Sequence, residues 1–149
     1  MERTEVIISL ALGFIIVMIY VLYVNGLCVI RAIRAVSFFG NLTKYGVCKA
    51  TVAGCSGYIK RIIKFNANGI YQYILESNIK KGDLEVRIFD TKKEQEIVLN
   101  KEHPKANITV KGKQRYYMLV NFQTVTGTFT VSWQCQNRFR IVAEKENDK

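Results

Sequence analysis

The sequence predicts an all-β fold, an antiparallel β-sandwich of about seven strands, preceded by one N-terminal transmembrane helix. Three observations predict it: a long uncharged apolar run near the N-terminus, short segments of period-two alternation from Tyr58 onward, and turn signals at roughly ten-residue intervals. The chain has 149 residues, enough for about one domain. Hydrophobic residues make up 49% of it, which excludes a wholly disordered chain.

The apolar run extends over Val6–Ile30, 25 residues without a charge, of which 21 are hydrophobic. A helix rises about 1.5 Å per residue, so roughly 20 residues cross the hydrocarbon core. Tyr20 and Tyr23 lie where an aromatic belt is expected. A cleaved signal peptide has a shorter apolar core and a basic front, whereas Met1–Glu5 holds two glutamates. We therefore expect residues 1–30 to remain as a membrane anchor, with membrane lipid as a partner.

Residues 31–57 are expected to form a connector, which begins with Arg31 and Arg34 and is interrupted by glycines. Its basic residues place the C-terminal side in the cytoplasm by the positive-inside rule. Val52–Cys55 (VAGC) matches the bacterial lipobox, which makes Cys55 a candidate lipidation site. The apolar run of a lipoprotein directly precedes its lipobox, but here 24 residues separate Ile30 from Cys55. The alternative is a chance match in a linker of small residues.

Residues 58–142 are expected to form the sandwich, and residues 143–149 a disordered tail. Seven segments read as strands: 58–65, 70–76, 84–90, 96–99, 106–110, 114–122 and 126–134. In 84–90, Leu84, Val86 and Ile88 face one way while Glu85 and Arg87 face the other. The expected core is Ile62, Ile74, Leu84, Val86, Ile88, Ile108, Val110, Met118, Val120, Phe129, Val131 and Trp133.

Four phrases carry a resemblance to a known group: residues 80–86 (KKGDLEV), 107–112 (NITVKG), 116–120 (YYMLV) and 127–133 (GTFTVSW). The stretch Ile70–Trp133 resembles small, uncharacterised β-sandwich proteins of Gram-positive envelopes. The resemblance implies a jelly-roll-like, lipoprotein-like module on the extracytoplasmic side of the cell membrane. It implies no catalytic residue. It also conflicts with the positive-inside rule over the side of the membrane.

Enzymatic chemistry is not expected, and neither is a cofactor or a metal. The one histidine, His103, precedes a proline in a charged loop and has no partner that would orient it as a base. Cys28, Cys48, Cys55 and Cys135 do not have zinc-site spacing, and their disulfide pairing stays open. Asp83, Glu85 and Asp90 are too spread along a strand for a calcium loop.

The net charge of +10 favours an anionic partner. Since the basic residues form no dense block, nucleic acid is not expected as the ligand, and an anionic envelope polymer, lipid or a partner membrane protein is. We expect a membrane-anchored, non-enzymatic binding module. One alternative is a carbohydrate-binding module, with Tyr73, Tyr117 or Trp133 as contact aromatics, although Trp133 is expected in the core. Another is an accessory subunit of a membrane complex, packed through Ser9 and Gly13 on one helix face.

Overall fold

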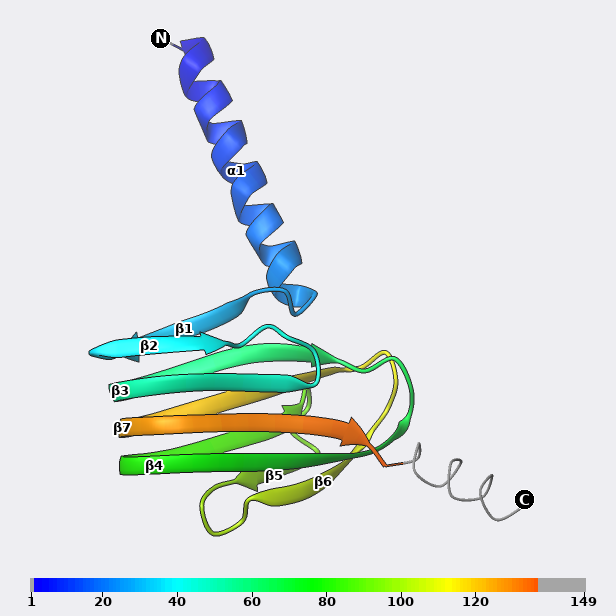
Figure 1. The fold of residues 1–149 in the computed structure, drawn as a ribbon. Helices are drawn as coiled ribbons and strands as arrows, with labels where there is room; N and C mark the ends of the chain where they lie inside the picture. The colour runs from blue at the N-terminus through cyan, green and yellow to red at the C-terminus, as the bar shows by residue number, and fades with distance from the viewer. Residues whose placement is uncertain (1, 137–149) are drawn as a thin grey trace, which may run out of the picture.

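A computed structural model describes residues 2–136 and contains one helix followed by seven strands, all paired antiparallel (Figure 1). The all-β prediction with a single N-terminal helix is confirmed. The helix is α1 (Glu2–Val24), and the strands are β1 (Val29–Arg34), β2 (Ser37–Asn41), β3 (Val47–Lys64), β4 (Gly69–Asp90), β5 (Glu96–Leu99), β6 (Lys105–Val110) and β7 (Arg115–Cys135).

Three long strands, β3, β7 and β4, run through the whole fold and bend at mid-length. The first half of β3 pairs with β2 and its second half with β1, while β4 pairs with β6 before its bend and with β5 after it. Register shifts in β3 and β4 mark the bends. The strands therefore form two layers, β2–β3–β7–β4–β6 and β1–β3–β7–β4–β5.

Glycines occupy the bends of β3 and β4 because a side chain does not fit there. Gly57 and Gly82 have φ of +118° and +81°, a region that favours glycine. A Cβ on Gly57 would lie 2.1 Å from the carbonyl oxygen of Ala32, and one on Gly82 would lie 2.2 Å from that of Gln123. The bends thus need both a left-handed backbone and close approach of the neighbouring strand.

The hydrophobic core lies between the two layers and draws on all seven strands and the β2–β3 loop. Phe122 and Phe129 of β7 lie on either side of its bend, with ring centroids 5.6 Å apart. At the other end of the core, Phe65 contacts Tyr71 and Tyr116. Of the expected core, all members are buried except Ile74, which is partly exposed because Tyr73 and Leu75 take the inward positions.

Helix α1 ends in a Schellman motif. Gly26, at φ +74°, donates from its N–H to the carbonyl of Tyr23, and Leu27 donates to that of Leu22. The most apolar 18 residues within Arg3–Val24 have a mean hydropathy of 2.7, and none of them is buried inside the protein. The helix is therefore long and apolar enough to cross a membrane, a test that a signal sequence also passes.

Two expectations about the elements are corrected. The connector expected over residues 31–57 instead belongs to the sheet, as β1, β2 and the first part of β3. The breaks between the expected strands 70–76 and 84–90, and between 114–122 and 126–134, are bends within β4 and β7, so four expected strands form two long ones. The tail expected at 143–149 and the end of the 58–142 domain lie outside the described residues.

Candidate functional site

The end of α1 packs directly on the sandwich. The Asn25 side-chain oxygen accepts a hydrogen bond of 2.7 Å from Lys64 Nζ, at the end of β3. A Cβ on Gly26 would approach the carbonyl oxygen of Ile62 to 2.7 Å, so the turn after the helix lies against β3. Ile62 points away from the inter-layer core, because it alternates with Arg61 and Ile63, and it is still buried. The junction therefore covers part of the outer face of β3.

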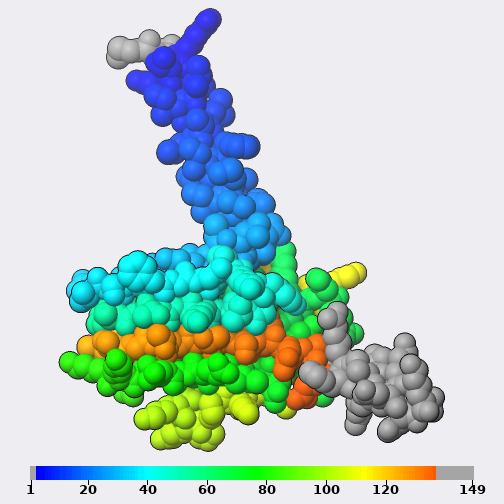
Figure 2. Space-filling model, viewed as in Figure 1, coloured from blue at the N-terminus to red at the C-terminus, as the bar shows by residue number. Residues whose placement is uncertain are grey.

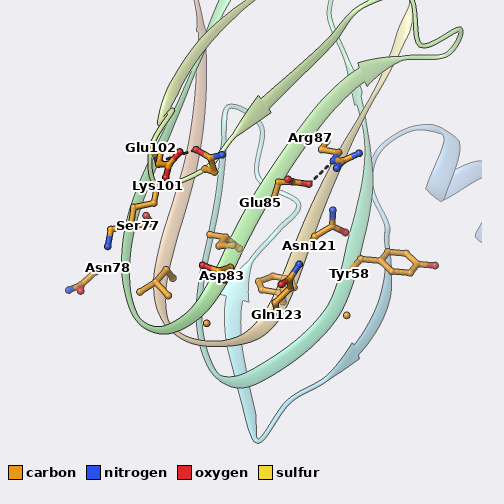
Figure 3. Close-up of a pocket in the computed structure, with 16 residues that line it drawn as sticks. Tyr58, Ser77, Asn78, Asp83, Glu85, Arg87, Lys101, Glu102, Asn121 and Gln123 are labelled. Atoms are coloured by element: carbon orange, nitrogen blue, oxygen red, sulfur yellow. Dashed lines mark hydrogen bonds and ion pairs between the residues drawn. The ribbon is translucent and has the colours of Figure 1, made fainter.

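An open groove of about 1020 Å³ lies on the outer face of the β4–β7–β3 layer, near the bends (Figure 3). Asp83, Glu85 and Arg87 point outward from β4 because Leu84, Val86 and Ile88 fill the core between them. Asn121 and Gln123 lie beside Glu85 and Asp83 on β7. Tyr58 of β3 is the next neighbour of Asn121 and is 42% exposed.

The loop after β5 forms one wall of the groove with Asn100, Lys101 and Glu102. The Asn100 side-chain oxygen accepts hydrogen bonds from the N–H groups of Glu102 (3.0 Å) and His103 (2.7 Å), which fixes the turn. His103 belongs to this turn and is exposed. No cluster of three or more metal-ligating side chains occurs within residues 2–136.

Arg87 forms the ion pairs at the groove. Arg87 Nε donates to Glu85 Oε1 at 2.6 Å, and Arg87 Nη1 lies 3.8 Å from Glu96 Oε1. The hydrogen bond that Arg87 donates to Glu85 raises the pKa of Arg87 above its ordinary value. The groove presents three carboxylates, two basic groups and several uncharged amides. Amides, carboxylates and an exposed tyrosine ring suit a neutral, polyhydroxylated ligand better than an anionic one.

A second polar cluster is buried between the layers around Arg61, whose side chain is inward because it shares the phase of Ile59 and Ile63. Arg61 Nη1 donates to the carbonyls of Leu42 (2.6 Å) and Lys44 (3.0 Å), and Nη2 to that of Thr43 (3.0 Å). Its guanidinium lies 5.3 Å from the ring centroid of Trp133. Burial lowers the pKa of Arg61 from its ordinary value. Arg61 therefore fastens the β2–β3 loop over the core.

The proposed contact aromatics occupy different environments. Tyr73 is fully buried and stacks on Trp133, with centroids 5.6 Å apart, so in this fold its ring is not offered to a ligand from solvent. Trp133 is 5% exposed, as expected of a core residue. Tyr117 lies on the outer face, stacked on Phe89 and covered by Lys60 Nζ at 4.6 Å. None of the three lines the groove.

Cys55 lies in the middle of β3, at its bulge, and is fully buried. Cleavage before it would remove β1, β2 and the first part of β3, so a chain that begins at Cys55 would lack strands that pair in this fold. All four cysteines are free. Burial raises the pKa of the Cys48 thiol to about 11, although nearby Arg61 lowers it in part.

Of these residues, the sequence pattern points to Asp83 and Glu85 but not to Tyr58, Asn121, Gln123 and Arg61. The outward groove residues follow from strand alternation once β3, β4 and β7 are known to be neighbours, which the sequence does not state. The inward direction of Arg61 could have been predicted from the sequence, because Arg61 alternates in step with the buried residues Ile59 and Ile63.

No family model matches the chain, and no curated protein matches it. Among solved structures, the Yersinia pseudotuberculosis-derived mitogen is 11% identical with a TM-score of 0.45, over 72% of this chain and 88% of that one. The enzymatically active domain of tailspike protein 4 of bacteriophage CBA120 is 11% identical with a TM-score of 0.43, over 72% of this chain and only 19% of that one.

A low-affinity xylan-binding module from Roseburia intestinalis is 9% identical with a TM-score of 0.37, over 74% of this chain and 96% of that one. All three TM-scores lie below 0.5. The function of this chain therefore has to come from its own residues.

Proposed function

We propose that this chain is a single-pass membrane protein whose β-sandwich is a non-enzymatic binding module. The observation that supports it most is α1, which projects from the sandwich (Figure 2). Its apolar side chains from Val6 to Val21 are exposed, and only its last residues pack on the protein. Such a helix is stable in a bilayer, where its backbone groups are satisfied internally. A soluble protein would carry the same side chains as an exposed apolar surface.

The test is membrane retention of the full chain after alkaline carbonate extraction. Replacing Leu12, Ile15 and Ile19 with lysine costs roughly 2.5–3.5 kcal/mol each at the bilayer centre, so the triple variant should leave the membrane. The matched control replaces Ile15 and Ile19 with leucine and should remain. Retention of the lysine variant would contradict the anchor.

A second readout separates an anchor from a cleaved signal sequence. An epitope at the N-terminus should stay on the mature protein if α1 is an anchor, and it should be lost if α1 is removed. Intact cells treated with protease then show on which side the sandwich lies, because only an extracytoplasmic sandwich loses a C-terminal epitope.

The groove favours a second candidate function, the binding of a neutral carbohydrate. Asn121, Gln123 and Glu85 form a polar row beside the exposed ring of Tyr58. Affinity electrophoresis in soluble xylan, in galactan and in anionic poly(glycerol phosphate) tests it. A Tyr58→Ala, Asn121→Ala variant should lose retardation in a neutral polymer, whereas Thr109→Ala, on β6 outside the groove, should keep it. No retardation of the parent protein in either neutral polymer would contradict this candidate.

A further inference from the structure

Acidic residues are absent from a long stretch of the chain, and the fold places the basic residues of that stretch on neighbouring strands. Residues 6–75 contain no aspartate or glutamate at all. After α1, the same stretch holds seven basic residues: Arg31, Arg34, Lys44, Lys49, Lys60, Arg61 and Lys64. It forms β1, β2 and β3, together with the first residues of β4. These three strands therefore have a positive charge that no acidic residue of their own balances.

The fold brings β1 and β2 together at the side of the sandwich nearest α1 (Figure 1). They are the edge strands of the two layers, because each pairs only with β3. We call residues 27–41, from the end of the helix turn through β1 and β2, the rim. Figure 2 shows the rim extending away from the foot of the helix, on the opposite side of the sandwich from β5 and β6.

The rim combines exposed apolar side chains with arginines. Leu27 is 62% exposed, Ile30 44%, Val36 88% and Phe39 73%. Arg31 and Arg34 are exposed between them, and the Arg31 guanidinium lies 5.4 Å from the ring centroid of Phe38. Apolar side chains interleaved with arginines are typical of segments that lie in the headgroup layer, because the apolar groups enter the lipid while the cations meet phosphate.

The covalent link to α1 limits how far the rim can be from lipid. Only residues 25–28 separate the last residue of the helix from the first of β1, so the two are at most about 18 Å apart. The Schellman turn and the Lys64–Asn25 hydrogen bond shorten and stiffen that link. The headgroup layer is itself roughly 5–8 Å thick on each side. Once α1 spans the membrane, β1 must begin in or next to the headgroups.

We propose that the rim rests on the bilayer and binds the phosphate groups of anionic phospholipids through Arg31 and Arg34, with Val36 and Phe39 inserted beside them. This inference depends on the proposed anchoring by α1. It also accounts for two open sheet edges, since the bilayer covers strands that would otherwise pair with other chains.

The test uses the full chain reconstituted in phosphatidylcholine alone, or in a three-to-one mixture with phosphatidylglycerol, each containing brominated lipid as a tryptophan quencher. Buried Trp133 of the parent protein gives the baseline. A Phe39→Trp variant should be quenched several-fold more than a Val98→Trp control, because Val98 is exposed on β5, on the far side of the sandwich. Val36→Trp is a second probe should Phe39→Trp not fold.

The anionic part of the inference is tested by adding Arg31→Gln and Arg34→Gln to the Phe39→Trp variant. Quenching in the phosphatidylglycerol mixture should fall to the level seen in phosphatidylcholine alone. Equal quenching in both lipids, with and without the arginines, would overturn the role of anionic lipid. If quenching of Phe39→Trp and Val36→Trp does not exceed that of Val98→Trp while the protein stays in the bilayer, the rim proposal fails and the anchor survives. A protein that leaves the bilayer contradicts the anchor itself.

Discussion

The strands near α1 and the strands far from it handle charge differently, although they share one core. Residues 29–64, which form β1, β2 and β3, carry basic residues only, and no salt bridge occurs among them. The far strands and their loops, residues 69–135, hold seven acidic residues beside ten basic ones. The three ion pairs within residues 2–136 all lie there, two of them made by Arg87. The near strands therefore have no acidic residue of their own to pair with, whereas part of the far strands' charge is paired within them.

Two arginines show the difference at the level of single residues. Arg61, in the near half, is buried and uses three main-chain carbonyls in place of a carboxylate. Arg87, in the far half, is exposed and pairs with Glu85 and Glu96. A buried guanidinium with fixed acceptors is part of the packing, while an exposed ion pair is screened by water. The halves should therefore respond unequally to the same substitution.

The largest loss of stability is expected for substitutions at the bends, which both halves of the fold share. Gly57→Ala in β3 and Gly82→Ala in β4 each place a Cβ against a neighbouring carbonyl at a left-handed φ. The crowding and the backbone strain together should lower the free energy of unfolding by roughly 2–5 kcal/mol. Urea denaturation of the full chain in detergent micelles measures this.

Gly46→Ala is the matched control for the bends. Gly46 also has a left-handed φ, +78°, but the nearest atom to its Cβ would be 3.8 Å away. It should lose only the backbone part, about 1–2 kcal/mol. A loss at Gly57 or Gly82 no larger than that at Gly46 would show that close approach of the strands is not what fixes the bends.

The next effect belongs to the near half alone. Arg61→Met keeps the length of the side chain but leaves the carbonyls of Leu42, Thr43 and Lys44 without their donor, which should cost about 1–3 kcal/mol. The β2–β3 loop should also become more sensitive to limited proteolysis than the rest of the sandwich. If the variant unfolds at the same urea concentration as the parent, the three hydrogen bonds do not fasten the loop.

The fold class could be predicted from the sequence because a strand with one buried face alternates apolar and polar residues, and this alternation is visible in a short segment. Leu84, Val86 and Ile88 alternate with charged neighbours, so that half of β4 was readable. β1 was not readable, because an edge strand beside α1 keeps apolar and basic residues on both faces, as Ile30 and Arg31 show. Its residues therefore looked like a connector.

The candidate groove was less predictable, and the reason is again physical. A bend within a strand and a hairpin turn favour the same residue types. Lys80–Asp83, with Gly82 at positive φ, is compatible with either. Only pairing with β7 keeps the chain in one bent strand, and pairing over some forty residues is not a local property. Without the order β3–β7–β4, Tyr58, Asn121 and Glu85 do not form a row.

The near half should also respond to alkaline pH through Cys48. Burial raises its pKa from 9.0 to about 11, so the folded protein holds the thiol proton more tightly than the unfolded chain does. Stability from this source is complete below pH 9 and is lost as the pH rises toward 11, at roughly 1 kcal/mol between pH 9 and 10. The urea midpoint of the parent should therefore fall more steeply over that range than that of Cys48→Ala. Parallel slopes would show that the thiol is not the group responsible.

The smallest effect is expected in the far half, at Arg87. Arg87→Met removes two ion pairs whose side chains are 36–45% exposed, and such pairs contribute about 0–1 kcal/mol. What it leaves behind is two carboxylates in contact with water, which need no replacement partner. The difference between the losses of unfolding free energy for Arg87→Met and Arg61→Met, measured in the same urea series, puts a number on the comparison between the halves.

Added salt should reduce the loss at Arg87 and leave the loss at Arg61 unchanged, because salt screens exposed charges and does not reach a guanidinium held by main-chain carbonyls. If the two variants lose the same free energy of unfolding, the burial of Arg61 does not make it more important for stability than the exposed Arg87. The proposed difference between the two halves would then be wrong.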